Sequence, residues 1–335
     1  MPAATGVPQH VLAARITRSA STQSYLTIRW LADRRYRADA FAIYAWFRWL
    51  DDMVDERLPD RGERLAFVGR QRRLLALGAD GVPLPGADEP GWAPLGPEEG
   101  LLVRLGASAS ALGADGEPLL RSLRTMLDVM EIDAARRGRP LTQRELDDYT
   151  HALAVAVTEA LHHCIGHGCP CPHDDTRYTA VTGAHVAHML RDLVTDVDAG
   201  YVNVPAEVLA EPGVSLEDLH SPAMRAWVRD RVELARACFA VGRRYLERVQ
   251  DPRCRLAGHA YTARFEWVLD AIEADDYRLR AGYPERATVR GGMRIAADAA
   301  RSALAARRPM APAPELTHAP VSVPVSVPAS AGAAR

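Results

Sequence analysis

Apolar residues recur at the spacing of an α-helix along most of this chain, and the alternation typical of a β-strand is nearly absent. Between residues 36 and 56, for example, Phe41, Tyr44, Leu50 and Val54 recur at helical spacing. Similar patterns predict helices over residues 21–31, 60–77, 98–112, 117–137, 142–165, 174–198, 215–250, 253–281 and 284–306. We therefore predict an all-α fold.

Local signals mark some of the helix ends. Thr142 with Glu145 has the pattern of a capping box, and Ser215 with Asp218 is a weaker version of it. Residues 78–97 are rich in Gly, Pro and Ala, which predicts a surface loop between helices.

The domain organisation follows from composition along the chain. From about Arg308 the sequence is rich in Pro, Ala, Val and Ser, has little to bury, and is predicted to be disordered. No linker divides the part before it. We predict an N-terminal extension (1–16), one helical domain (17–306) and a tail (307–335).

Charge and cysteine content exclude several classes of protein. The chain has 41 basic and 43 acidic residues, every basic one an arginine, and this balance argues against a nucleic-acid partner. Five cysteines among 335 residues are no disulfide scaffold. The first twenty residues lack the order of a signal peptide, and no run of about 18 apolar residues occurs. We expect a cytoplasmic protein, and a peripheral membrane contact stays open.

Two acidic segments interrupt helical faces that are otherwise apolar and aromatic. Their sequences are Arg-Trp-Leu-Asp-Asp-Met-Val-Asp-Glu and Arg-Asp-Leu-Val-Thr-Asp-Val-Asp, with Asp51 and Asp55 four residues apart in the first and Asp192 and Asp196 in the second. Residues four apart share a helical face, where like charges repel by about 0.2–0.5 kcal/mol per pair. Solvated helix faces are one explanation. A face built for burial, however, requires a cation beside such carboxylates.

Carboxylate oxygens favour Mg²⁺, which commonly bridges carboxylates to substrate phosphates. If the two helices face each other, they would hold a cluster of Mg²⁺ ions between them. The predicted ligands are Asp51, Asp52, Asp55, Asp192 and Asp196. Such ions stabilise a diphosphate as a leaving group, and aromatic neighbours stabilise a carbocation in a dry pocket. The pattern predicts ionisation of an allylic diphosphate inside a helical bundle.

These segments resemble the squalene/phytoene synthase family of isoprenoid synthases. Residues 41–56 are similar to the family's first aspartate-rich motif with its preceding Tyr and Arg, and residues 189–196 to the second. Further matches are Gly200 and Pro205 after the second motif, Thr142, Glu145, Leu146 and Tyr149 at a helix start, and Arg255 with residues 269–277 on a late helix. The similarity extends from about residue 17 to residue 300.

The resemblance implies a single isoprenoid synthase domain with a central cavity, acting as a Mg²⁺-dependent prenyltransferase. Two prenyl diphosphates (C15 or C20) would join head to head through a cyclopropylcarbinyl diphosphate, which rearranges to a squalene- or phytoene-like hydrocarbon. The implied substrate contacts are Arg48, Arg191, Arg255 and Tyr277. The implied catalytic residues are Tyr44, Arg48, Tyr149, His185 and His188.

The chain departs from the family pattern around the diphosphate. His185 and His188 stand where Gln and Asn are usual, and Phe265 stands where a Tyr is usual. Gly282 stands at the position of a family Arg, although this sequence has an arginine nearby, Arg280. Neutral imidazoles would donate hydrogen bonds, imidazolium would pair with diphosphate, and a histidine would also accept a proton from a cation. Packing between helices is the structural alternative for both histidines. A terpene synthase that cyclises or hydrolyses a single prenyl diphosphate is therefore the alternative function.

Other clusters suggest different chemistry. Residues 162–173 carry several histidines and cysteines, but Cys-x-Cys between prolines is not the usual zinc spacing, and a polar loop is the alternative. Glu159-x-x-His162 and Glu217-x-x-His220 resemble half of a di-iron carboxylate centre, although no further glutamate pair completes it. A non-catalytic helical protein is the remaining reading.

Several properties stay open at this stage. They are prenyl chain length, product identity, coupling against cyclisation, oligomeric state and NADPH use. The lack of a Gly-x-Gly-x-x-Gly motif does not decide NADPH use, because reductive members of the family need no such motif. We expect a prenyl diphosphate as substrate. A hydrophobic product is the reason to expect membrane contact.

Overall fold

The computed structural model describes residues 9–86, 92–284 and 297. Within these residues the chain forms eleven α-helices, a π-turn and a 3₁₀ turn, and no strand, which confirms the all-α prediction. The elements are α1 (Gln9–Ala20), α2 (Thr22–Leu31), α3 (Arg37–Asp52), η1 (Met53–Arg57), α4 (Arg61–Asp80), α5 (Pro97–Ala111), η2 (Gly113–Gly116), α6 (Glu117–Arg136), α7 (Gln143–Cys164), α8 (Thr176–Asp198), α9 (Ala206–Leu209), α10 (Pro222–Arg248) and α11 (Pro252–Ala274).

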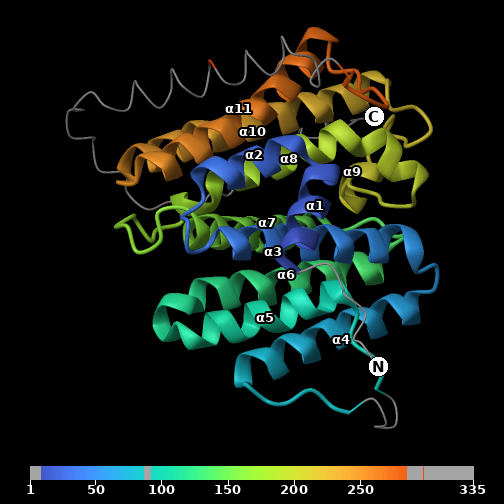
Figure 1. Cartoon of the computed structure of the whole chain (residues 1–335). Coiled ribbons are helices and arrows are strands. Elements are labelled where there is room, and N and C mark those ends of the chain that lie inside the picture. Colours follow the sequence, from blue (N-terminus) through green and yellow to red (C-terminus); the bar gives the residue numbers. More distant parts are fainter. Residues whose placement is uncertain (1–8, 87–91, 285–296, 298–335) are drawn as a thin grey trace, which may run out of the picture.

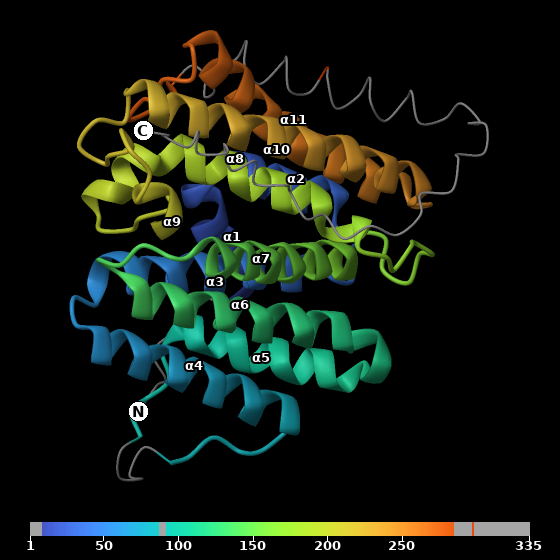
Figure 2. The same cartoon turned by 180° about the vertical axis from the view of Figure 1, so that it is seen from behind.

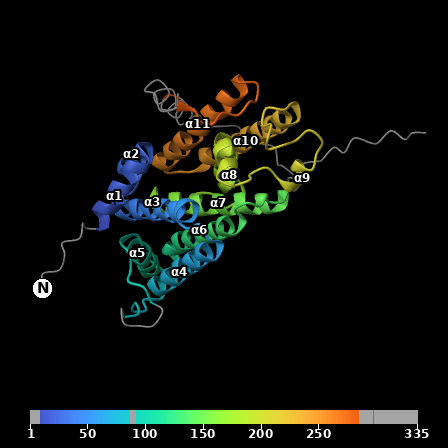
Figure 3. The same ribbon diagram turned by 90° about the vertical axis from the view of Figure 1, so that its right-hand side faces the viewer.

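The helices are stacked in layers, with α7 in the middle. Figure 1 shows α4, α5 and α6 below α3 and α7, and α8, α10 and α11 above them. The view from behind (Figure 2) and the side view (Figure 3) give the same order. One apolar core fills the space among α3 to α7, and a second joins α8, α10 and α11. Helix α7 packs on α6 below and on α8 above, so the space between the two cores is lined by α7 and α8.

Capping explains where two helices begin. The predicted capping box is present: the Glu145 N–H donates to Thr142 Oγ1 (3.2 Å), and Glu145 Oε2 accepts from the Thr142 N–H (2.8 Å). The predicted helix start at Ser215 is wrong. Ser215 accepts from a nearby N–H within a turn, and α10 begins at Pro222, capped by Ser221. Proline suits the first helical position because its missing N–H has no partner to lose there.

The chain leaves α11 earlier than the sequence pattern indicates. The helix ends at Ala274, because Asp276 (φ 55°) and Tyr277 (φ 60°) adopt left-handed backbone conformations that terminate it. Helix α1 was not predicted and runs across the expected boundary after residue 16. The helix predicted over 284–306 falls almost entirely outside the described residues, and so does the tail (307–335). No described helix is long and apolar enough to cross a membrane.

Helices α8 and α10 approach each other closely at two glycines. A Cβ added to Gly242 would lie 2.6 Å from Ala180 Cβ, and one added to Gly183 would lie 2.9 Å from the Ala235 carbonyl oxygen. The absence of side chains at these positions allows backbone contact. This contact fixes the position of α8, the helix that carries the second acidic segment.

Candidate active site

A cavity of about 340 Å³ is lined by charged and polar side chains from α3, η1, α6, α7, α8 and the loop after α8. We call it the acidic cavity. Its lining residues are Arg48, Asp51, Asp52, Asp55, Glu56, Asp133, Arg136, Tyr149, His185, His188, Met189, Arg191, Asp192, Asp196, Tyr201 and Asn203. The two acidic segments, more than a hundred residues apart in sequence, therefore lie on the wall of one cavity.

The first segment lies where α3 changes from an α-helix to a π-turn. The α-helix ends at Asp52, and residues 53–57 continue as the π-turn η1, which carries Asp55. Such π-turns occur frequently at functional sites. Arg48 Nη1 contacts Asp51 Oδ2 at 3.1 Å, and the same guanidinium also pairs with Asp52. One arginine therefore compensates part of the charge of two neighbouring carboxylates.

The second segment is held differently. Asp192 lies 2.8 Å from His188 Nε2 and accepts a hydrogen bond from Arg191 Nε (2.6 Å). Burial opposes ionisation of Asp192, but these hydrogen bonds outweigh it and lower the pKa of its carboxyl well below the ordinary value. One turn further, Asp196 Oδ2 accepts from Asn203 Nδ2 at 2.9 Å. Asp192 is thus an ionised carboxylate that already has partners.

Three carboxyls of the cavity have raised pKa values. Burial, followed by repulsion from Asp55, raises the pKa of Asp51 to about 7. Burial raises the pKa of Asp55 to about 6, against the opposing effect of the Tyr201 hydroxyl. Burial and the charge of Asp192 raise the pKa of Asp196 to about 7. Carboxylates on both walls are therefore crowded and undercompensated, which a bound cation would relieve.

A buried network connects α6 and α7 to the loop that follows α8. Tyr149 Oη donates to Asp133 Oδ2 (2.8 Å), and Arg136 Nε donates to Asp133 Oδ1 (2.7 Å). Arg136 Nη1 donates to Asn203 Oδ1 at 2.9 Å. The same guanidinium lies 5.1 Å from the Tyr149 ring centre and 5.2 Å from that of Tyr201. Because Asn203 also contacts Asp196, this network connects the floor of the cavity to the second acidic segment.

The two histidines differ in environment. His185 is buried, neither of its ring nitrogens has a hydrogen-bond partner among the described residues, and burial lowers its pKa to about 3. Its ring lies 5.3 Å from the Tyr149 ring. His188 is 48% exposed and faces Asp192, with its ring 6.2 Å from that of Phe265. His185 is therefore a neutral imidazole whose buried ring nitrogens have no hydrogen-bond partner among the described residues.

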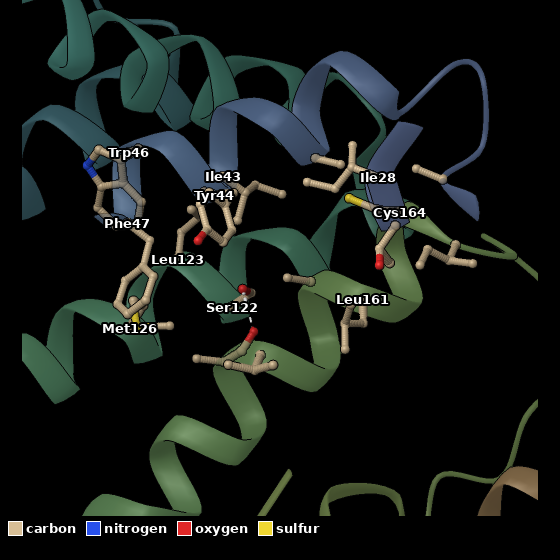
Figure 4. A pocket seen from close by; sticks show the side chains of 17 residues that line it. Ile28, Ile43, Tyr44, Trp46, Phe47, Ser122, Leu123, Met126, Leu161 and Cys164 are labelled. Atoms are coloured by element: carbon tan, nitrogen blue, oxygen red, sulfur yellow. Dashed lines mark hydrogen bonds between the residues drawn. The ribbon is translucent and has the colours of Figure 1, made fainter. Parts of the chain in front are cut away.

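A second cavity, of about 160 Å³, is almost entirely apolar (Figure 4). We call it the apolar cavity. Helices α2, α3, α6 and α7 and residues near them line it with Thr27, Ile28, Ala32, Ala40, Ile43, Tyr44, Trp46, Phe47, Ser122, Leu123, Met126, Ala156, Val157, Ala160, Leu161, Cys164 and Ile165. The Ser122 hydroxyl in its wall is satisfied, because it donates to the Ala156 carbonyl oxygen at 2.7 Å. The cavity therefore offers hydrocarbon a wall with few competing hydrogen-bonding groups.

Three helices line both cavities in a consistent order. On α3, Tyr44 and Phe47 line the apolar cavity, and Arg48 and Asp51 line the acidic one. Helix α6 likewise passes from Met126 to Asp133 and Arg136, and α7 passes in the opposite sense from Tyr149 to residues 156–164. The acidic and apolar cavities are therefore neighbours along the same helices.

The family model described as squalene/phytoene synthase matches residues 17–292. The chain belongs to this family. Its members transfer prenyl groups, and this protein is an enzyme of that class.

Solved structures agree on the fold. Squalene synthase HpnC from Alicyclobacillus acidocaldarius superposes with a TM-score of 0.63 at 23% identity, covering 82% of this chain and 98% of that one. A dehydrosqualene synthase in complex with a ligand superposes with a TM-score of 0.67 at 16% identity, covering 89% and 97%. No curated protein sequence matches the chain.

Three predicted site residues of this family member do not line the acidic cavity. Tyr44 lies one turn before Arg48 and lines the apolar cavity instead. Arg255 lies in the first turn of α11, about 15 Å along the helix from Phe265, which faces His188. Tyr277 follows the end of α11, and its ring lies 4.8 Å from the Arg229 guanidinium.

Four residues of the acidic cavity lie outside the predicted segments and were not predicted: Asp133, Arg136, Tyr201 and Asn203. A signal existed for the first two. Asp133 and Arg136 are 5% and 4% exposed and continue the apolar stripe of α6 that includes Met126 and Met130. A charged pair three residues apart on a buried face indicates a buried ion pair. No comparable local signal identifies Tyr201 or Asn203, because their partners come from other helices.

The donor set fits magnesium. Asp51, Asp55 and Asp196 would hold the ions, with Asp52 and Asp192 beside them. Among the described residues, no three His, Cys, Asp or Glu side chains are already arranged to hold one ion. Mg²⁺ keeps several waters and usually binds one or two carboxylates together with substrate phosphates, so its binding does not require three protein ligands.

The side chains of the two rival clusters have other partners in the described structure. His162 Nδ1 lies 3.6 Å from Cys254 Sγ and 3.9 Å from Cys171 Sγ, and its other nitrogen lies 2.9 Å from Tyr245 Oη. Glu159 is buried and forms a two-point ion pair with Arg177 (3.0 and 3.2 Å), so it is not a free ligand. Residue 217 lies exposed in a turn before α10, away from this buried pair. The di-iron reading therefore lacks its ligand set.

Proposed function

We propose that this enzyme is a Mg²⁺-dependent prenyltransferase that joins two prenyl diphosphates of C15 or C20 head to head. The product would be a squalene- or phytoene-like hydrocarbon formed through a cyclopropylcarbinyl diphosphate. The observation that supports this most is the placement of both aspartate-rich segments on one cavity, next to an apolar cavity lined by the same helices. A prenyl diphosphate has a matching division into a highly charged head and a hydrocarbon chain.

Each group in the acidic cavity has a proposed task in binding the charged head. When bound, Mg²⁺ supplies electrostatic stabilisation of the diphosphate leaving group. Arg48 and Arg191 orient the diphosphate, because both guanidinium groups line the cavity. Asp133 holds Arg136 and the Tyr149 hydroxyl in fixed positions through its two oxygens, so that the floor of the site is preorganised.

Groups in the apolar cavity and at its border have tasks in the hydrocarbon chemistry. The apolar wall excludes water from the allylic cation, and the rings of Tyr44 and Phe47 lie on α3 within about one turn of Arg48. The double bond of the second substrate attacks this cation, and closing the cyclopropane ring releases one proton. The imidazole of His185, which is unprotonated at neutral pH because burial lowers its pKa, accepts it.

The alternative is a terpene synthase that ionises and cyclises a single prenyl diphosphate. One observation favours it: the apolar cavity beside the acidic cavity has a volume of only about 160 Å³, and a further apolar cavity, across α7, has a volume of about 40 Å³. One prenyl chain requires one such cavity. The same acidic cavity serves either reaction, so the product decides between them.

The deciding experiment incubates the purified enzyme with farnesyl or geranylgeranyl diphosphate and Mg²⁺, with and without NADPH, and analyses the extracted hydrocarbons by mass. A product with twice the carbon number supports coupling, and a cyclic product with the original carbon number supports the alternative. Asp51→Asn and Asp192→Asn should abolish turnover, whereas Asp230→Asn, on the exposed face of α10, should not. Undiminished diphosphate release by the first two variants would overturn the metal-site proposal.

A further inference from the structure

Helix α2 separates the apolar cavity from the outside of the molecule. Thr27 and Ile28 on its inner face line the apolar cavity, where Figure 4 shows Ile28. Leu26 and Trp30, four residues apart on its outer face, are 47% and 68% exposed. No residue of α2 is fully buried. A single helix therefore has hydrocarbon-binding space on one side and uncovered apolar side chains on the other.

Uncovered apolar side chains are concentrated in this region. In the part of the chain that the structure describes, five large apolar side chains are exposed. Val11, Leu26 and Trp30 lie on α1 and α2, and Val82 and Leu84 lie in the loop after α4. Trp30 is the most exposed of the five and the only aromatic one among them. An exposed tryptophan beside an aliphatic residue is typical of a surface that enters a membrane interface.

The same region carries a strong positive charge, although the whole chain has a net charge of −2. Residues 9–37 contain six arginines and one carboxylate, Asp33, which is paired with Arg253. Arg15, Arg18, Arg29, Arg34 and Arg35 are exposed and form no ion pair with another described residue. The Arg29 guanidinium lies 5.4 Å from the Trp30 ring, so charge and apolar surface are adjacent.

We propose that this α1–α2 surface, consisting of Val11, Leu26, Trp30 and the five exposed arginines, docks on an anionic lipid membrane. Leu26 and Trp30 enter the headgroup boundary, and the arginines contact lipid phosphates. The apolar cavity then lies one helix away from the bilayer. Only the purpose of this docking, transfer of a hydrophobic product into lipid, depends on the proposed function.

Size and charge favour a membrane over a second copy of the chain. A symmetric dimer through this surface would bring two sets of five positive charges together. Stable dimers bury about 800 Å² per partner, whereas the uncovered apolar side chains here belong to two short helices. An anionic bilayer supplies opposite charge, and each arginine near it strengthens binding by roughly fivefold.

The test is co-sedimentation of the full-length enzyme, without substrate, with phosphatidylcholine vesicles and with the same vesicles containing phosphatidylglycerol. We expect binding only to the anionic vesicles, with loss of binding at high salt. Leu26→Ser/Trp30→Ser and Arg18→Glu/Arg29→Glu should each weaken binding by more than about tenfold. The matched control, Val82→Ser/Leu84→Ser, removes similarly exposed apolar groups elsewhere and should bind as the wild type does.

Insertion of the tryptophan is tested separately with brominated lipids. Trp30→Phe keeps an apolar ring and should keep binding, but it should lose the part of the fluorescence quenching that comes from Trp30. Absence of wild-type binding to anionic vesicles, or equal loss in the Val82/Leu84 control, overturns the proposal. A dimer that dissociates in Leu26→Ser/Trp30→Ser would also overturn it. Turnover measured in detergent should be unchanged in both serine variants. A failure of the membrane-docking proposal is therefore distinguishable from a failure of the proposed reaction.

Discussion

Replacing Asp51 by asparagine should stabilise the metal-free enzyme while abolishing turnover. Burial and the neighbouring Asp55 raise the pKa of Asp51 to about 7, from 3.8 in an unfolded chain. Between these two values the folded state binds more protons than the unfolded state does, so the free energy of unfolding falls as the pH rises through this window. Asparagine has no charge to bury and removes this pH-dependent penalty.

The magnitude follows from the pKa and the surroundings of the carboxylate. One pKa unit corresponds to about 1.4 kcal/mol, which sets a ceiling of about 4 kcal/mol for Asp51. One fact reduces it: the side chain is 27% exposed, so solvent screens part of the cost of charging it, whereas the attraction of Arg48 is already contained in this pKa. We expect Asp51→Asn to raise the free energy of unfolding by about 1–2 kcal/mol near pH 8 and by about a third of that near pH 5.

The assay is urea unfolding followed by circular dichroism, in buffer with EDTA, at both pH values. Asp192→Asn is the matched comparison, because hydrogen bonds from Arg191 and His188 outweigh burial and lower the pKa of Asp192. Its carboxylate stabilises the fold above the unfolded pKa, so this variant should be destabilised near pH 8 by about 1 kcal/mol. If Asp51→Asn destabilised the protein near pH 8, or had the same effect at both pH values, the account of crowded carboxylates would be wrong.

Three further variants test the packing around the two cavities. Asp133→Asn should lower the free energy of unfolding by about 3 kcal/mol in urea, because Arg136 and Tyr149 lose a buried ionised acceptor; a loss under about 1 kcal/mol would contradict this role. Ala160→Phe should fill the apolar cavity and reduce hydrocarbon formation at least about tenfold, with inorganic diphosphate binding by calorimetry unchanged. Gly242→Ala should cost about 1–3 kcal/mol in thermal unfolding, since its Cβ would lie 2.6 Å from Ala180; an unchanged melting temperature would refute the close approach.

Most of the fold was predictable because its signals are local. Apolar periodicity and the Thr142 cap identify helices from a few neighbouring residues, and these elements lie where the sequence indicates. The errors in helix boundaries occur where a second local signal for a helix start or end competes with the apolar pattern. Ser221 and Pro222 provide a better helix start than Ser215, and the left-handed Asp276 ends α11 inside a pattern that continues. Helix α1 was missed because it buries only two residues, Ala13 and Thr17.

The site was predictable to the extent that its residues lie in recognisable segments. Four-residue spacing places Asp51 and Asp55 on one face, and the π-turn after Asp52 keeps both on the cavity wall. The Arg136 network was not predictable, because Asn203 reaches it only through the path of the loop after α8. Which part of α11 lies beside the acidic cavity likewise depends on how the helix packs. The motif match on this helix therefore suggested a substrate contact for Arg255, whereas the structure places Arg255 in the first turn of α11, away from that cavity.

The order of residues along three helices explains how charge and hydrocarbon are kept apart. Helices α3 and α6 run from the apolar to the acidic cavity, and α7 runs back, so the lining changes from apolar to charged along all three. On α3 this border lies between Phe47 and Arg48, and Asp51 follows about 6 Å further along the axis. A diphosphate held at the acidic side would therefore leave its allylic carbon beside Tyr44 and Phe47. A carbocation formed there would lie within about one helical turn of Asp51, a carboxylate that would hold Mg²⁺, and against the apolar and aromatic wall.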